Sequence, residues 1–127
     1  MTDMDDSLKY TQSSANELLP AVKDRLAELQ QAYATLERLN LQARASSETN
    51  GGGPSSTSAW KQATEQIGDL LEWFNERNLI VRDVAQGLID FPAILGGEDV
   101  VLCWRAPEPS VDFWHYPDAG FAGRQPI

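Results

Sequence analysis

The sequence predicts an α+β domain, in which an antiparallel helical hairpin kinked at Pro20 packs on a small antiparallel β-meander with an ordered C-terminal tail. Apolar residues recur at steps of three and four before Leu79 and at steps of about two after it, which are the periods of helices and strands. The chain has 127 residues, enough for one hydrophobic core but not for two. We therefore expect a single domain with a lead-in over 1–9, helices over 10–45 and 59–78, a flexible linker over 46–58, and the meander with the C-terminal motif over 79–127.

The first helix has a recognisable start and an internal interruption. Thr11 is a suitable N-cap, and Ser14 stands where a capping box usually has Glu or Gln. Pro20 has no backbone N–H, and its ring meets the preceding turn, so it disrupts a continuous helix. We expect a short helix to about Leu18 and then a kink or restart, with Pro20 near the first turn of a longer helix.

Two apolar seams predict that the helices pack on each other. Both seams repeat at steps of three and four, the spacing of helices that cross at a shallow angle. Between them, the Gly- and Ser-rich stretch 46–58 offers almost nothing to bury. The seams predict core rather than a cofactor site, and they consist of Leu19, Val22, Leu26, Leu29, Tyr33 and Leu36, then Trp60, Ala63, Ile67, Leu70 and Phe74.

Four short strands are expected after the hairpin. They cover 79–83, 87–91, 100–104 and 111–115, and turn residues such as Gly96 and Gly97 stand between them. Pro92 ends the second strand in this interpretation, because proline cannot donate a hydrogen bond to a ladder. Short strands joined by tight turns form an antiparallel meander.

The strand over 100–104 is apolar on both faces. Its even-numbered side chains, from Val100 to Trp104, point to one side, and its odd-numbered ones, Val101 and Cys103, point to the other. The helical hairpin covers one face. The other needs the C-terminal tail, with Phe121 as its anchor, or a second copy of the chain. We therefore expect self-association, with a homodimer as the simplest closed assembly.

Composition and charge exclude several partner classes. The net charge of −9 repels nucleic-acid phosphates and anionic membrane surfaces, and the basic residues are scattered among acids. No apolar run approaches the roughly 20 residues that span a bilayer. The acidic start lacks the features of a secretory signal, and a single cysteine cannot form an internal disulfide, so we expect a reducing cytoplasm.

Four segments carry motifs that are specific enough to compare with known families. They are Ala-Asn-Glu-Leu-Leu-Pro (15–20), Leu-Ile-Asp-Phe-Pro (88–92), Leu-Cys-Trp-Arg (102–105) and the stretch 113–126, in which Trp-His precedes Asp-Ala-Gly-Phe-x-Gly-Arg. Together they resemble the prokaryotic family catalogued as domain of unknown function 2203, over nearly the whole chain apart from the lead-in and linker. Two departures are visible. Tyr116 stands where an acidic residue is common, which removes one potential carboxylate ligand next to His115, and 106–109 replaces a more usual turn that contains Gly. The family has no established activity, so the resemblance supports the fold and its boundaries.

The chain concentrates its rare residues between Cys103 and Arg124. This segment holds the only Cys, the only His and two of the four Trp. The His-x-x-Asp spacing across a proline lets His115 and Asp118 converge on one metal ion, or else bond each other or nearby backbone and fix the tail. The candidate binding or structural cluster is Asp90, Arg105, Trp114, His115, Asp118, Phe121 and Arg124.

Cysteine and arginine in this segment have both an ordinary and a functional interpretation. Cys103 lies in mid-strand, where a thiol is typically a small buried apolar group, and the charge of Arg105 on the same face disfavours a metal there. Arg105 and Arg124 each offer a planar fork to an internal carboxylate, such as Asp90 or Asp118, or to a bound anion.

These observations favour a small structural or interaction protein that self-associates through its hairpin and sheet and carries no cofactor. The alternative is a metal- or anion-binding protein, or an enzyme, whose site lies in the C-terminal motif. The residues alone leave enzymatic activity undecided.

Overall fold

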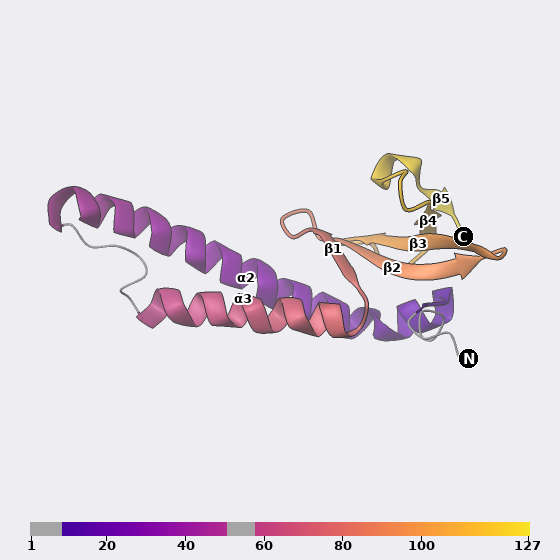
Figure 1. Ribbon diagram of the computed structural model, residues 1–127, viewed down its shortest axis with the longest axis horizontal. Coiled ribbons are helices and arrows are strands. Elements are labelled where there is room, and N and C mark those ends of the chain that lie inside the picture. Colours follow the sequence, from indigo (N-terminus) through magenta and orange to yellow (C-terminus); the bar gives the residue numbers. More distant parts are fainter. Residues whose placement is uncertain (1–8, 51–57) are drawn as a thin grey trace.

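The protein is built in three layers, with the sheet between the helical hairpin and the C-terminal tail (Figure 1). The computed structural model describes residues 9–50 and 58–127. Its five strands follow one another in chain order, each antiparallel to the next. The α+β prediction is confirmed. The elements are α2 (Gln12–Asn50), α3 (Ser58–Glu76), β1 (Ile80–Asp83), β2 (Leu88–Leu95), β3 (Glu98–Arg105), β4 (Phe113–His115), the 3₁₀ turn η2 (Phe121–Gly123) and β5 (Gln125–Pro126).

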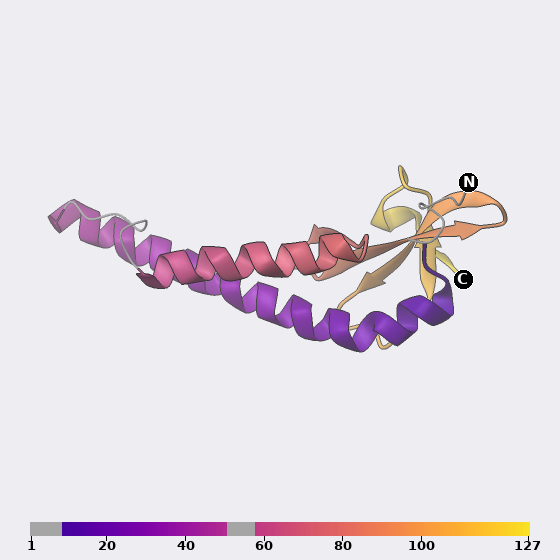
Figure 2. The same cartoon turned by 60° about the horizontal axis from the view of Figure 1, so that its bottom comes forward.

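Helix α2 begins at a reciprocal cap and continues through its proline. The Ser14 N–H donates to Thr11 Oγ1 at 3.0 Å, and the Thr11 N–H donates to Ser14 Oγ at 2.9 Å. The Ser14 hydroxyl therefore accepts the hydrogen bond that a glutamate accepts in the usual capping box. Pro20 lies inside one continuous helix, so of the two predicted outcomes the restart after Leu18 is wrong, and the predicted kink agrees with a bend in the helix (Figure 2). The N-terminal turns of α2 lie at an angle to the rest of the helix (Figure 2). The helix therefore accommodates the proline by bending.

The hairpin seams are largely as predicted, except that the buried face of α2 shifts by one residue after Leu29. In α2 the seam is buried as far as Leu29, but Tyr33 is 38% exposed and Ala32 is buried in its place. A straight helix turns every 3.6 residues, so a strict heptad drifts off the buried face after a few turns. In α3 the buried residues are Ala63, Ile67, Leu70 and Phe74.

The end of the hairpin differs from the predicted linker. Helix α2 runs to Asn50, five residues into the stretch expected to be flexible, and 51–57 lie outside the described residues. The paired helices extend well beyond the sheet as an arm (Figures 1 and 2). Trp60 Nε1 donates to Asn40 Oδ1 at 3.1 Å and ties the helices together along this arm. Among the described helices, none is long and apolar enough to cross a bilayer.

Strand β2 passes through Pro92, so the predicted end of that strand is wrong. β1 pairs with β2 only as far as Asp90, which leaves β2 as an edge beyond that point. The Tyr10 N–H donates to Pro92 O at 2.7 Å from this edge, so the missing N–H of Pro92 faces away from β3. Gly96 and Gly97, with φ of 59° and 81°, then form the two-residue turn between β2 and β3.

The two faces of the sheet are both covered within one chain. The core cluster lies between the hairpin and one face, to which the sheet contributes Ile89, Phe91, Ala93, Val100, Leu102 and Trp104. The other face carries Val101 and Cys103, 4% and 1% exposed, on the side where the C-terminal segment lies (Figure 1). Phe121 is 40% exposed, so the tail does not depend on burying it as an anchor.

Candidate metal centre

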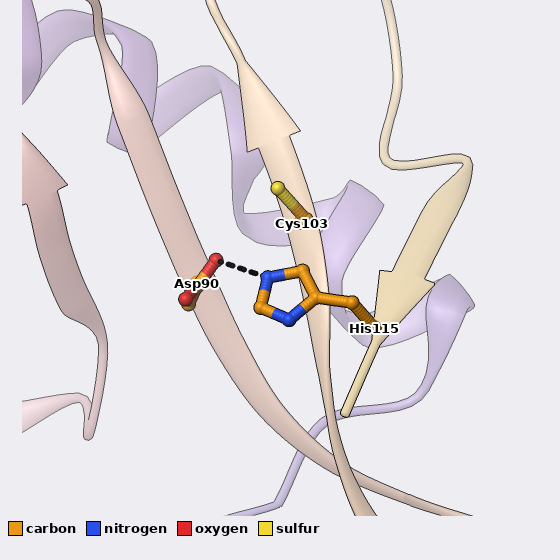
Figure 3. Close-up of side chains that lie close together, drawn as sticks. All are labelled: Asp90, Cys103 and His115. Carbon is orange, nitrogen blue, oxygen red and sulfur yellow. Dashed lines mark ion pairs between the residues drawn. The ribbon is translucent and has the colours of Figure 1, made fainter. Parts of the chain in front are cut away.

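Three neighbouring strands bring Asp90, Cys103 and His115 together beneath the tail. Asp90 of β2 is the register partner of Cys103 in β3, and His115 of β4 is the partner of Val101, two residues before the cysteine. Because side chains alternate along a strand, all three point to the same face. Figure 3 shows them converging, and one ligand atom from each lies within 4.8 Å of the others. All three residues are buried, at 1%, 1% and 2% exposure.

The hydrogen bonding of His115 determines which nitrogen faces the cluster. Nδ1 lies 2.7 Å from the carbonyl oxygen of Tyr116, which can only accept, so Nδ1 carries a proton. Nε2 lies 3.6 Å from Asp90 Oδ1. In the neutral imidazole, the lone pair of Nε2 therefore faces a carboxylate oxygen across a buried gap. Two electron-rich atoms in this arrangement need a proton or a cation between them.

Arg82 holds the other oxygen of the carboxylate. Its Nε donates to Asp90 Oδ2 at 2.6 Å. The β1–β2 register shifts between Val81 and Asp83, which places Arg82 in a β-bulge, a feature that commonly re-aims a side chain beside a site. Asp90 is thus fixed through Oδ2, and Oδ1 is left facing the histidine.

Cys103 is held in its protonated form when no metal is bound. Burial, and then the neighbouring Asp90 carboxylate, raise the pKa of the Cys103 thiol from 9.0 to about 12. A histidine nitrogen is a common base for a thiol nucleophile, but Nδ1 of His115 faces Tyr116 and Nε2 faces Asp90. This geometry disfavours nucleophilic catalysis by Cys103.

A pocket of about 240 Å³ opens over the cluster. Four of the seven residues in the predicted cluster line it, namely Asp90, His115, Asp118 and Phe121. Asp118 is exposed, and Asp90 and Cys103 accompany His115 in the ligand group, a set that differs from the His115 and Asp118 pair proposed from spacing. The remaining lining residues are Arg82, Leu88, Cys103, Pro117 and Gly120.

The other three predicted site residues, Trp114, Arg105 and Arg124, do not line the pocket. Trp114 packs against the core on the helix side of β4, and its ring meets Tyr116 edge-on with centroids 5.0 Å apart. Arg105 is exposed and stands over the Phe121 ring at 5.5 Å. The Tyr116 hydroxyl donates to Glu98 at 3.0 Å.

Arg124 fixes the tail to the sheet. Its Nη2 donates to Glu108 Oε2 at 2.6 Å, so its partner is neither of the expected acids, Asp90 and Asp118. Its guanidinium lies 4.0 Å from the centre of the Phe113 ring and 4.5 Å from that of Phe121. These contacts make Arg124 a structural clamp beside the pocket.

A family model described as an uncharacterized conserved protein (DUF2203) matches residues 9–127, essentially the whole chain. The chain belongs to the DUF2203 family. No curated protein matches this DUF2203 member, and no solved structure does. What the buried cluster does must therefore be argued from its own geometry.

The ligand types of this DUF2203 protein fit a zinc-class ion. In a tetrahedral zinc site, a nitrogen and an oxygen that each lie about 2.0–2.1 Å from the metal are about 3.3 Å apart. The separation of 3.6 Å between His115 Nε2 and Asp90 Oδ1 is close to that value. A bound ion would also supply the cation that the facing lone pairs need.

Sequence reasoning missed Cys103 and Arg82 as members of this site. The signal for Cys103 was the Gly96-Gly97 turn, because a two-residue loop pairs position 90 with position 103. That register could not be followed once the second strand was ended at Pro92. Arg82 depends on a bulge, for which the sequence offers no recognisable pattern.

Proposed function

We propose that this protein binds a transition-metal ion of the zinc class through Asp90 Oδ1, Cys103 Sγ and His115 Nε2. The observation that carries the proposal is the convergence of three buried ligand atoms within 4.8 Å, from three adjacent strands. Thiolate and imidazole ligands favour zinc, copper or iron, whereas magnesium and calcium prefer oxygen ligands. The ion would displace the thiol proton, because metals bind the thiolate.

The ligand count favours a site that acts on another molecule. Structural zinc sites have four protein ligands, whereas catalytic sites have three and leave a position for water or substrate. Here three ligands lie at the base of the pocket, and that pocket supplies the space for a fourth, exchangeable ligand. An ion in this position would act as a Lewis acid on what enters the pocket.

Metal analysis with matched variants tests the proposal. Purified protein loaded with zinc or cobalt and then desalted should retain one ion per chain. Cobalt should produce a thiolate charge-transfer band, which can arise only from Cys103 because the chain has no other cysteine. Cys103→Ser and His115→Ala should lose the ion, and Asp118→Asn should keep it.

The control is Asp112→Asn, which removes an exposed carboxylate outside the pocket. Wild-type protein that retains no metal would overturn the proposal. Metal that persists in both ligand variants would do so as well. Metal that is lost only in Asp118→Asn would favour the His115 and Asp118 pair that was predicted from sequence spacing.

The thiolate ligand fits a reducing compartment, and cytoplasmic location is part of this proposal.

Self-association is a second candidate function, favoured by the helical hairpin rather than by the sheet. The tail covers the second face of β3, so that strand no longer requires another copy. Along the hairpin, however, Leu41 is 56% exposed, and Leu71 and Tyr33 are 37% and 38% exposed. Sedimentation at micromolar concentration should show a dimer that Leu41→Glu dissociates and Gln42→Glu does not, and a wild-type monomer would refute it.

A further inference from the structure

The pocket over the metal ligands contains a second recognition element, the guanidinium of Arg82. We propose that the pocket binds a small oxyanion, a carboxylate or phosphate group, that bridges the bound metal ion and Arg82. This inference rests on the proposed metal binding and adds the chemical class of the ligand.

The first support is the way Arg82 is used. Its Nε is occupied by Asp90, and its side chain remains 46% exposed and lines the pocket. The terminal Nη groups of a guanidinium held at Nε are therefore available to an acceptor in the pocket. Guanidinium forks match the two oxygens of a carboxylate or phosphate.

The second support is the open position beside the three ligands. Asp90, Cys103 and His115 supply one ligand atom each, so a four-coordinate ion would have one position open toward the pocket that Arg82 also lines. An anion that occupies this position and contacts Arg82 gains a bond to the ion that the metal-free protein does not offer. An anion should therefore bind to the metal-loaded protein in preference to the metal-free one.

The third support is the size and lining of the pocket. Its volume of about 240 Å³ corresponds to about eight water molecules at their volume in the liquid. Leu88, Pro117 and Phe121 give it apolar walls. The pocket therefore fits one anionic group that carries a short apolar part.

Cobalt-loaded protein tests this inference with three probes of similar size. Acetate or inorganic phosphate should shift the visible cobalt bands, and acetamide, the neutral counterpart of acetate, should not. The anion that binds more tightly, acetate or phosphate, identifies the carboxylate or the phosphate as the preferred group. Metal-free protein, followed by calorimetry, should bind the same anion much more weakly.

Two variants locate the contact. Arg82→Gln should keep its cobalt and bind the anion about 10- to 100-fold more weakly, the loss expected for a hydrogen bond to a charged group. Asp118→Asn, which leaves Arg82 and all three ligands in place, should bind the anion more tightly because a like charge has been removed.

Failure of the two proposals can be told apart. If wild-type protein takes up no cobalt, the metal site itself is wrong and this inference falls with it. If cobalt binds but neither anion shifts its bands, only the oxyanion site is wrong. Equal anion affinity in Arg82→Gln, or in the metal-free protein, would overturn the bridging role. Should Arg82→Gln lose cobalt, the Asp118→Asn measurement decides, and an unchanged or lower affinity there contradicts the inference.

Discussion

Replacing Arg124 with alanine should release the C-terminal tail from the sheet. The side chain is only 10% exposed, bonds Glu108 at 2.6 Å, and lies against the rings of Phe113 and Phe121. A hydrogen bond between charged groups contributes about 1.5–3 kcal/mol, and a partly desolvated ring contact about 0.5–2 kcal/mol. Arg124 Nε is buried and has no hydrogen-bond partner among the described residues, so its removal recovers part of that loss. We expect a net destabilisation of about 2–3 kcal/mol.

Thermal melting of the metal-free protein measures this loss. For a chain of this size, 1 kcal/mol corresponds to about 4 °C, so the midpoint should fall by about 10 °C. The matched control is Arg105→Ala, which removes an exposed arginine with a single ring contact at 5.5 Å and should cost less than about 1 kcal/mol. Asp118→Ala should change little, because the carboxylate is exposed. Equal midpoints for Arg124→Ala and Arg105→Ala would refute the clamp.

Three further changes have defined outcomes. Zinc at a hundredfold excess over its dissociation constant should stabilise the protein by about 2.7 kcal/mol, and His115→Ala should abolish the effect in calorimetry. Tyr10→Phe removes a hydrogen bond to Arg77 O and should cost about 1 kcal/mol at pH 7. Burial raises the pKa of Tyr10, so its contribution is complete below the ordinary value of 10.0 and is lost as pH rises through the folded value. Urea unfolding at pH 7 and above pH 10 should therefore show a smaller difference between wild type and Tyr10→Phe at the higher pH. Gly87→Ala should destabilise the fold, because φ is +72° and the new Cβ would lie 2.8 Å from a neighbouring side chain. Gly68→Ala, in a helix with open space around it, should stabilise it by up to about 1 kcal/mol, and the opposite order of melting would contradict the argument.

The parts of the fold that follow from local periodicity could be predicted from the sequence. The hairpin and the first four strands were found because their apolar spacing is set by the elements themselves. The errors have tertiary causes. Pro20 is tolerated because α2 can bend. Pro92 is tolerated because β2 has no β1 partner beyond Asp90, so no ladder bond on that side needs the N–H that proline lacks. β5 has only two residues, too few to show a period.

The candidate site was only partly predictable for the same reason. His115 and Asp90 were selected by residue type, which requires no knowledge of neighbours. Cys103 becomes a ligand only through its pairing with Asp90, and Arg82 reaches that carboxylate only through a bulge. Pairing register and bulges are relations between strands, so an apolar pattern within one strand does not contain them.

The pairing of Asp90 with Cys103 also bears on how the sheet chooses its register as it folds. Val100–Trp104 is apolar on both faces, so burial alone discriminates weakly between the native pairing and one displaced by a single residue. Such a displacement would turn Cys103 toward the helices and separate it from the carboxylate and the imidazole. The three polar side chains therefore mark one register of an otherwise permissive strand, and an ion that joins them would bind that register and no other.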